Sequence, residues 1–256
     1  MMKTSLYYKI VWSALHLFYR KPKTTFEIAP DDEPSVFVGN HSSIHGPVLM
    51  TLFFPRKHKT WVISCALDPS KCANYAYHDI FFGESRKHKR IWRFFGQLIR
   101  IALPPLLRDA DTIPVYHSAG ITKTFRQSLA ALQDGDDLVI FGESPARFSE
   151  YVHELQPGFI DLAKLYYRKT GKKLKFYPFY AERKTKTIAV GAPVAYDPAV
   201  PLPMQRDQTA TYLRDSIDRL GRSLPPHTPV PFLPERWYSA YGQYEQDVMG
   251  YWQLME

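Results

Sequence analysis

The chain of 256 residues has only two cysteines, Cys65 and Cys72. Two cysteines exclude a zinc site built from four thiolates. A mixed metal site with the nearby His78 and Asp79 is the alternative that the spacing leaves open. Two reduced, partly buried thiols in a reducing compartment are the simpler interpretation, so we expect no metal.

The sequence also lacks a long hydrophobic run. No stretch approaches the roughly 20 apolar residues that span a bilayer. The apolar run at residues 10–19 contains His16, and no small-residue cleavage site follows it, so we expect no signal peptide. Any membrane contact should therefore be peripheral.

Basic residues outnumber acidic ones, and the formal net charge is +8. This balance favours an anionic partner, such as lipid head groups, nucleic acid or a phosphorylated substrate. Basic residues spread over the surface for solubility would explain it equally well. No nucleic-acid-binding motif is recognisable, so we expect no nucleic-acid partner.

Two segments, residues 7–20 and 87–108, combine basic side chains with a wide apolar face at helical spacing. We expect Pro104 and Pro105 to end the second helix. Two such helices in one chain favour binding to the surface of an anionic membrane. For the first helix, docking on the protein's own core is the alternative.

Strand and helix patterns alternate through the rest of the chain. Strands are predicted at residues 35–39, 60–64, 112–116, 137–141, 174–180 and 187–194, and helices at 47–54, 121–132, 157–170 and 204–220. This order predicts an α/β fold, a single domain with a mixed, largely parallel sheet flanked by helices. We expect an amphipathic membrane-associating helix at 1–24, the α/β domain at 25–225 and a Pro- and aromatic-rich extension at 226–256.

The sharpest chemical feature is the run Asn40-His41-Ser42-Ser43, directly after a buried strand. Loops at strand ends are where α/β sheets hold their functional sites. An unperturbed histidine titrates near 6.5, so its neutral form can accept a proton from an attacking hydroxyl or amine. His41 is thus a candidate general base.

Three blocks resemble the glycerolipid acyltransferase superfamily, the relatives of 1-acylglycerol-3-phosphate acyltransferase. Residues 40–47 resemble the motif N-H-x-S-x-x-D-x-P, with a shorter Ser-to-Pro spacing. Residues 141–147, Phe-Gly-Glu-Ser-Pro-Ala-Arg, resemble F-P-E-G-T-R-S, and residues 177–179 and 190–193 resemble V-P-V followed by G-x-P. The blocks also occur in the family's order, and they span residues 36–195.

The resemblance implies a fold and an activity. It implies an acyltransferase that moves a fatty acyl group from a thioester donor to a hydroxyl, or an amine, of a lipid-like acceptor. Acyl-coenzyme A or acyl carrier protein would be the donor substrate, without a cofactor, at the cytoplasmic face of the membrane. His41 and Glu143 would be catalytic, and the expected substrate-binding residues are Asn40, Ser42, Ser43, His45, Gly46, Tyr116, Ser144 and Arg147.

One departure from the family concerns the group that orients the histidine. Gly46 stands where the family has an aspartate. In Ser-His-Asp hydrolases, loss of such a carboxylate lowers turnover by about 10⁴-fold. We expect Glu143 to replace it; Asp79, His45 or a backbone carbonyl are alternatives.

The phosphate-binding arginines depart as well. Tyr116 takes the position of one, and Arg147 stands one place beyond the other. Since a bidentate guanidinium is the natural clamp for phosphate, we do not expect lysophosphatidic acid to be the acceptor.

Two other functions remain open. A catalytically impaired lipid-binding protein on the same fold would explain Gly46. Residues 142–146 resemble the nucleophile elbow G-x-S-x-A of a serine esterase, with Ser144 as the nucleophile. Such an elbow uses the backbone N–H of the next residue, and that residue is Pro145, which has none.

Overall fold

The computed structural model describes residues 5–80, 88–116, 120–148 and 150–232, without the side chains of 78–79 and 145–148. The chain divides into two compact units. One contains residues 14–61 and 125–232, and the other contains residues 62–124 together with the first 13 residues. The helix α1 (Leu6–Phe18) begins in the second of these and ends in the first.

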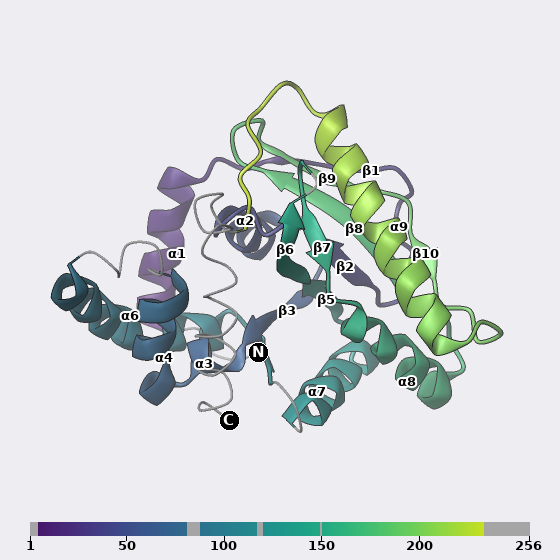
Figure 1. Cartoon of the computed structure of the whole chain (residues 1–256), viewed down its shortest axis with the longest axis horizontal. Coiled ribbons are helices and arrows are strands. Elements are labelled where there is room, and N and C mark those ends of the chain that lie inside the picture. The colour runs from purple at the N-terminus through teal and green to yellow at the C-terminus, as the bar shows by residue number, and fades with distance from the viewer. Residues whose placement is uncertain (1–4, 81–87, 117–119, 149, 233–256) are drawn as a thin grey trace. The chain divides into compact units, whose positions relative to one another are not determined.

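A mixed sheet forms the centre of the unit of residues 14–61 and 125–232 (Figure 1). Its strands follow the order β1-β9-β8-β2-β5-β3, and the short β10 pairs with β8. Their bounds are β1 (Lys23–Phe26), β2 (Val36–Gly39), β3 (His58–Ile63), β5 (Asp137–Ile140), β8 (Lys175–Glu182), β9 (Thr187–Val190) and β10 (Val194–Ala195).

Parallel pairing dominates this sheet. The strand β2 runs parallel to both of its neighbours, β5 and β8, and β5 runs parallel to β3. The β8–β9 and β8–β10 pairs are antiparallel. The predicted fold class, an α/β fold with a largely parallel sheet flanked by helices, is confirmed.

The register places the ends of β2 and β5 at the same level, beside the middle of β8. Val38 of β2 is level with Ile140 of β5 on one side and with Pro178 of β8 on the other. The segments that follow β2 and β5 therefore leave the sheet side by side, next to the second half of β8, which continues to Glu182. Every residue of β2 and β5 is buried, so these strand ends are held by the core rather than by a surface loop.

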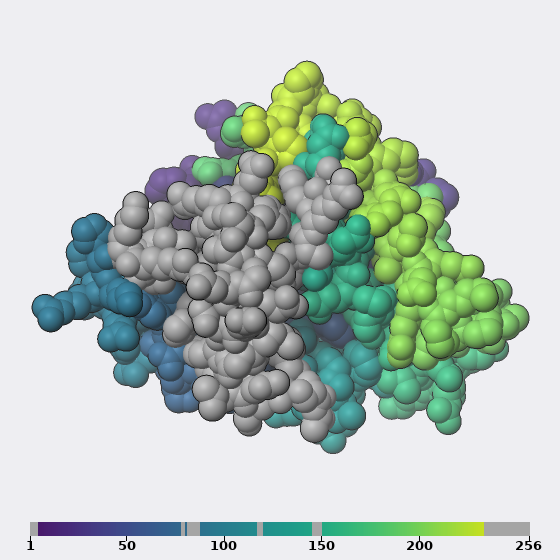
Figure 2. Space-filling model, in the orientation of Figure 1, coloured from purple at the N-terminus to yellow at the C-terminus, as the bar shows by residue number. Residues whose placement is uncertain are grey.

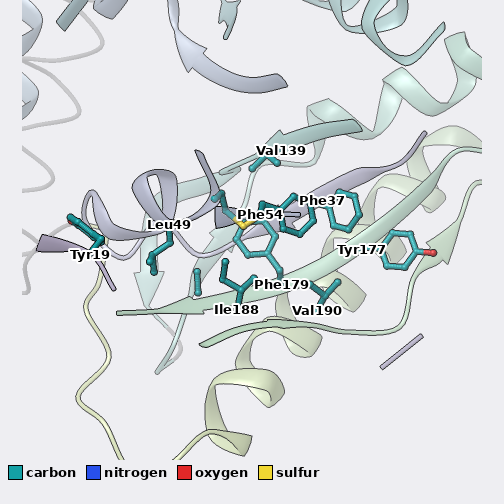
Figure 3. Packing of buried hydrophobic residues seen from close by; sticks show 11 residues of the cluster. Tyr19, Phe37, Leu49, Phe54, Val139, Tyr177, Phe179, Ile188 and Val190 are labelled. Atoms are coloured by element: carbon teal, nitrogen blue, oxygen red, sulfur yellow. The ribbon is translucent and has the colours of Figure 1, made fainter. Parts of the chain in front are cut away.

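The core covers both faces of the sheet. On one face, Leu49 and Phe54, from α2 (His45–Phe53) and its end, belong to a buried hydrophobic cluster with Phe37, Phe179 and Tyr177, which Figure 3 shows. The opposite face carries the alternate side chains of β8, and there α9 (Leu202–Ser223) packs against the strand. Figure 2 shows α9 as a continuous ridge on the surface.

The remaining elements of this unit flank the sheet. They are α7 (Ile121–Gln133), which starts in the other unit, the two-stranded sheet β6 (Glu143–Phe148) and β7 (His153–Leu155), the short 3-10 helix at Pro157–Ile160 and α8 (Asp161–Thr170). The helix α8 ends at Gly171, whose φ of 72° is the left-handed conformation that glycine adopts without strain.

The other unit is mainly helical. It contains α3 (Ser64–Leu67), α4 (Pro69–Tyr75), a π-helical turn at Ala76–Ile80, α6 (Lys89–Asp109) and the strand β4 (Ile113–Val115). The helices α3 and α4 pack against α6. Cys65 and Cys72 are buried thiols that form no disulfide.

The prediction that Pro104 and Pro105 end the second amphipathic helix is wrong. Both prolines lie inside α6, which continues to Asp109. Pro104 is buried, and Arg108 beyond it donates a hydrogen bond of 2.8 Å to the carbonyl oxygen of Leu67. Packing of α3 and α4 against α6 holds the helix together although the two prolines lack backbone donors.

Candidate active site

His41 lies at the carboxyl end of β2, in the loop that leads into α2. Val36–Gly39 form a buried central strand because the run is apolar and has partners on both sides. Crevices beyond the carboxyl ends of parallel strands are the usual ligand sites of α/β sheets. The sequence-predicted base is thus at the edge of the sheet where chemistry is expected.

One nitrogen of the His41 ring faces the protein backbone. Its Nδ1 contacts the carbonyl oxygen of Ser43. A carbonyl oxygen only accepts hydrogen bonds, so this contact requires a proton on Nδ1. In the neutral ring the proton on Nδ1 leaves Nε2 with a lone pair, which is the atom that can accept a proton from a substrate.

Asn40 joins the loop to β8. Its amide nitrogen donates to the carbonyl oxygen of Ala181 at 3.2 Å, and its amide oxygen accepts from the N–H of Ala181 at 2.8 Å. The side chain is fully buried. Asn40 therefore fixes the start of the loop on the neighbouring strand.

Glu143 holds the loop from the other side. One carboxylate oxygen accepts from the backbone N–H of His41 at 2.5 Å, and the other accepts from the backbone N–H of His153 at 2.9 Å. We expected this carboxylate to orient the His41 ring, but the ring nitrogen contacts the Ser43 carbonyl instead. Glu143 touches the main chain of His41, which makes it a positioning residue.

Two phenylalanine rings pack against His41, and one of them also lies near His153. The Phe141 ring lies 5.3 Å from that of His41, and Phe232 lies 4.6 Å from it. Phe232 also contacts His153, at 6.4 Å. Phe141 directly follows β5, so its position could be inferred, whereas Phe232 arrives through the segment after α9, which runs back toward α2 (Figure 1).

Burial shifts the pKa values of both acidic and basic groups here. It lowers the pKa of His41 to about 4, against the opposing effect of the hydrogen bond to Ser43. It raises the pKa of Glu143 to about 7, although the two backbone N–H groups favour the ionised form. The loss of hydration in an apolar enclosure disfavours the charged form of each group.

The remaining predicted residues of the loop differ in exposure. Ser42 is buried and Ser43 is exposed. The Nδ1 of His45 lies 2.7 Å from the hydroxyl of Tyr19, and burial together with the Arg183 charge lowers the pKa of His45. The guanidinium of Arg183 lies 4.8 Å from the centre of the Tyr19 ring. Arg183 directly follows β8 and is a cation at this edge that sequence reasoning missed.

The other predicted residues lie elsewhere or beyond description. Ser144 is partly buried within β6. Tyr116 belongs to the other unit, where its ring lies 4.8 Å from the Lys123 ammonium. The side chains of Asp79 and Arg147 lie outside the described residues. Among the described residues, no cluster of His, Cys, Asp or Glu could hold a metal ion.

Comparison with known proteins does not identify a family for this chain. No family model matches the chain, and no curated protein matches it. Among solved structures, the chain is similar to the crystal structure of the 1-acyl-sn-glycerophosphate acyltransferase PlsC from Thermotoga maritima, at 14% sequence identity. The similarity covers 84% of this chain and 77% of that chain, with a TM-score of 0.43. Similarity of this extent does not assign an activity to the chain.

The enclosure of His41 predicts its titration. Its pKa should be about 4, well below the usual 6.5, when followed by NMR of histidine-labelled protein with His41→Asn to assign the signal. Between pH 6.5 and 4 the unfolded chain would bind a proton that the folded one does not, so the contribution of His41 to stability falls as the pH falls. Titration of His41 between pH 6 and 7 would contradict a low pKa and a ring that stays neutral below pH 6.

Proposed function

We propose that this chain is an acyltransferase. It transfers a fatty acyl group from a thioester, acyl-coenzyme A or acyl carrier protein, to a hydroxyl or amine of a lipid-like acceptor. The observation that carries the proposal is His41, with Nδ1 held by a backbone carbonyl and Nε2 left as the proton acceptor, at the carboxyl end of a buried parallel strand. The three ordered sequence blocks that resemble acyltransferase motifs support the choice of reaction.

The reaction needs one base and no covalent enzyme intermediate. The Nε2 of His41 takes the proton of the acceptor hydroxyl while the oxygen attacks the thioester carbonyl carbon. The tetrahedral intermediate collapses with cleavage of the carbon–sulfur bond, and the leaving thiolate takes the proton back from the imidazolium. The products are an ester and a free thiol, so atoms and charge balance.

The low pKa of His41 keeps the ring in its neutral, proton-accepting form at pH 7, and it also makes the ring a weaker base than an unperturbed histidine. A ring with a pKa of about 4 is neutral in nearly every molecule at pH 7 and is ready to accept a proton. The same low value makes the imidazolium a strong acid, which favours proton return to the leaving sulfur. Glu143 would contribute by holding the backbone of His41 rather than by exchanging protons with substrate.

The local structure disfavours a serine esterase. A nucleophile elbow needs a sharp strand-to-helix turn that exposes the serine hydroxyl. Ser144 instead lies inside the strand β6, which pairs with β7, and the residue after it is a proline. A catalytically impaired lipid-binding protein remains the alternative, and loss of a carboxylate at Gly46 is the observation that favours it.

The acceptor would be met at a membrane surface. The helix α6 exposes large apolar side chains, with Phe94 61% and Ile101 69% exposed, and carries Arg90, Arg93 and Arg100 among them. In the same unit, the hydroxyl of Tyr7 at the start of α1 donates to the carbonyl oxygen of Ala102, at 3.0 Å. Apolar side chains beside arginines match an anionic lipid surface.

This contact would be peripheral and, by our proposal, on the cytoplasmic face. Among the described residues, no helix is long and apolar enough to cross a membrane. The exposed residues Leu6 and Ile10 of α1 belong to the same unit as α6 and would add to its apolar surface. Acyl donors and lipid acceptors would then be brought to the protein by the bilayer itself.

Removal of the base should abolish transfer. In liposomes of total lipid extract with radiolabelled long-chain acyl-coenzyme A or acyl carrier protein, we expect wild type to form a labelled lipid. His41→Asn should reduce the rate at least about hundredfold, the usual contribution of a general base. The matched control is His88→Asn, because His88 is exposed in the other unit. Unchanged transfer by His41→Asn would contradict the proposal, and no transfer by wild type would favour the lipid-binding alternative.

The proposed membrane surface makes a separate prediction. Phe94→Glu combined with Ile101→Glu should weaken co-sedimentation with phosphatidylglycerol vesicles about tenfold or more, because each change removes apolar burial and adds a repelled charge. Met204→Glu is the matched control, since Met204 is 53% exposed on α9. Binding by the double variant equal to that of Met204→Glu would show that α6 does not face the lipid.

A further inference from the structure

The loop that carries His41 folds back on itself. The backbone N–H of Gly46 donates to the carbonyl oxygen of His41 at 3.0 Å, and that of His45 donates to the carbonyl of Ser42 at 3.0 Å. Ser42 and Ser43 have φ values of 46° and 56°, in the left-handed region that non-glycine residues seldom adopt. This turn points the Ser43 carbonyl oxygen at the Nδ1 of His41.

Gly46 is required by the same turn. A Cβ atom on residue 46 would collide with the carbonyl oxygen of Asn40 and would lie 2.9 Å from that of His41. Its third neighbour would be the ring of Phe141, at 3.1 Å. Two of these are backbone atoms held by the strand end and by the Asn40 clamp, so they cannot yield as a flexible side chain would. An aspartate therefore has no room at this position.

The start of the turn, at Asn40 and His41, is anchored by two independent contacts. The Asn40 side chain bonds to the backbone of Ala181, and the Glu143 carboxylate accepts from the N–H of His41. A strained turn persists only where its surroundings over-determine it, and strain of this kind is concentrated at functional sites. The two positive φ values thus belong to a conformation that the core maintains.

We propose that the backbone carbonyl of Ser43 is the positioning acceptor for His41 in this chain, in place of a carboxylate, and that Gly46 exists to permit it. The inference rests on the proposed acyl transfer and deepens it. The carbonyl holds the ring in the tautomer with Nε2 open, as a carboxylate would. Gly46 is therefore a part of a working site rather than the mark of a lost one.

A neutral acceptor changes the electrostatics of the base. A carbonyl fixes the tautomer but adds no negative charge to stabilise the imidazolium that forms during the reaction. The proton on Nε2 must then leave quickly. A thiolate leaving group meets this need, because it takes up the proton as the carbon–sulfur bond breaks. The arrangement suits thioester donors better than donors that need a long-lived imidazolium.

Gly46→Ala and Gly46→Asp test the inference together. Both add the Cβ that the turn excludes, but only the aspartate adds a carboxylate. We expect both to lower kcat at least about hundredfold through misplacement of the ring, with KM within about threefold of wild type. The matched controls are Gly158→Ala and Gly158→Asp, because a Cβ on Gly158 meets nothing within 4 Å. If Gly46→Asp is as active as wild type, or tenfold above Gly46→Ala, the inference is overturned.

A second substitution covers the case in which the Gly46 variants do not fold. The side chain of Ser43 is exposed, so Ser43→Val should fold, but a β-branched residue resists the left-handed φ of 56°. We expect its kcat to fall at least about fivefold below that of Ser43→Gly, which adopts this φ freely. Equal kcat values for the two variants would argue against the carbonyl as the positioning group.

The pKa of His41 can be measured without any acyl transfer, so it tests this inference separately from the proposed function. A carboxylate close to the ring would raise the pKa of His41 by one unit or more. We expect Gly46→Asp and Gly46→Ala to show the same His41 pKa by NMR, within about half a unit. A pKa one unit higher in Gly46→Asp would overturn the inference, and this holds even if wild type transfers no acyl group.

Discussion

Parallel pairing of β2 with β5 and β8 is the constraint on which the candidate site depends. Because β2 and β5 end beside each other while β8 continues past them to Glu182, the segments beginning at Asn40 and Phe141 leave the sheet next to Ala181 of β8. The two clamps on the His41 loop come from this neighbourhood, one from Glu143 and one from the backbone of Ala181. A shift in strand register would separate these segments from Ala181 and leave the loop without support.

The conformation of the loop determines how the His41 ring is oriented. Its backbone turns twice through left-handed φ values and closes on Gly46, which brings the carbonyl of Ser43 to the His41 ring. Burial among Phe141 and Phe232 keeps the ring neutral. The orientation of the ring and its low pKa thus come from backbone conformation and packing, without a charged side chain on the imidazole.

Much of this arrangement could be predicted from the sequence. The fully apolar runs at 36–38 and 138–140 are typical of central parallel strands, and the order of the blocks predicts that His41 and Glu143 meet. The prediction failed where an outcome depends on tertiary contacts. Nothing local indicates that residues 143–148 and 153–155 pair as two strands, or that α6 continues through Pro104.

The role of Glu143 shows the same limit at the level of single atoms. The order of the sequence blocks predicts that the Glu143 carboxylate lies near His41. Whether it contacts the ring or the backbone depends on the positive φ values of Ser42 and Ser43, which the sequence does not indicate. A motif compares side chains, so from the sequence Gly46 is simply a missing aspartate. The structure explains the glycine, because the carbonyl oxygens of Asn40 and His41 leave no room for a Cβ atom.

The most direct test of this account is the tautomer of His41, measured from the ¹⁵N chemical shifts of its ring nitrogens at pH 7 in labelled wild-type protein. The account predicts a neutral ring with the proton on Nδ1 and an unprotonated Nε2. A ring with its proton on Nε2, or a doubly protonated ring, would contradict it, because neither leaves Nε2 able to accept a proton from a substrate.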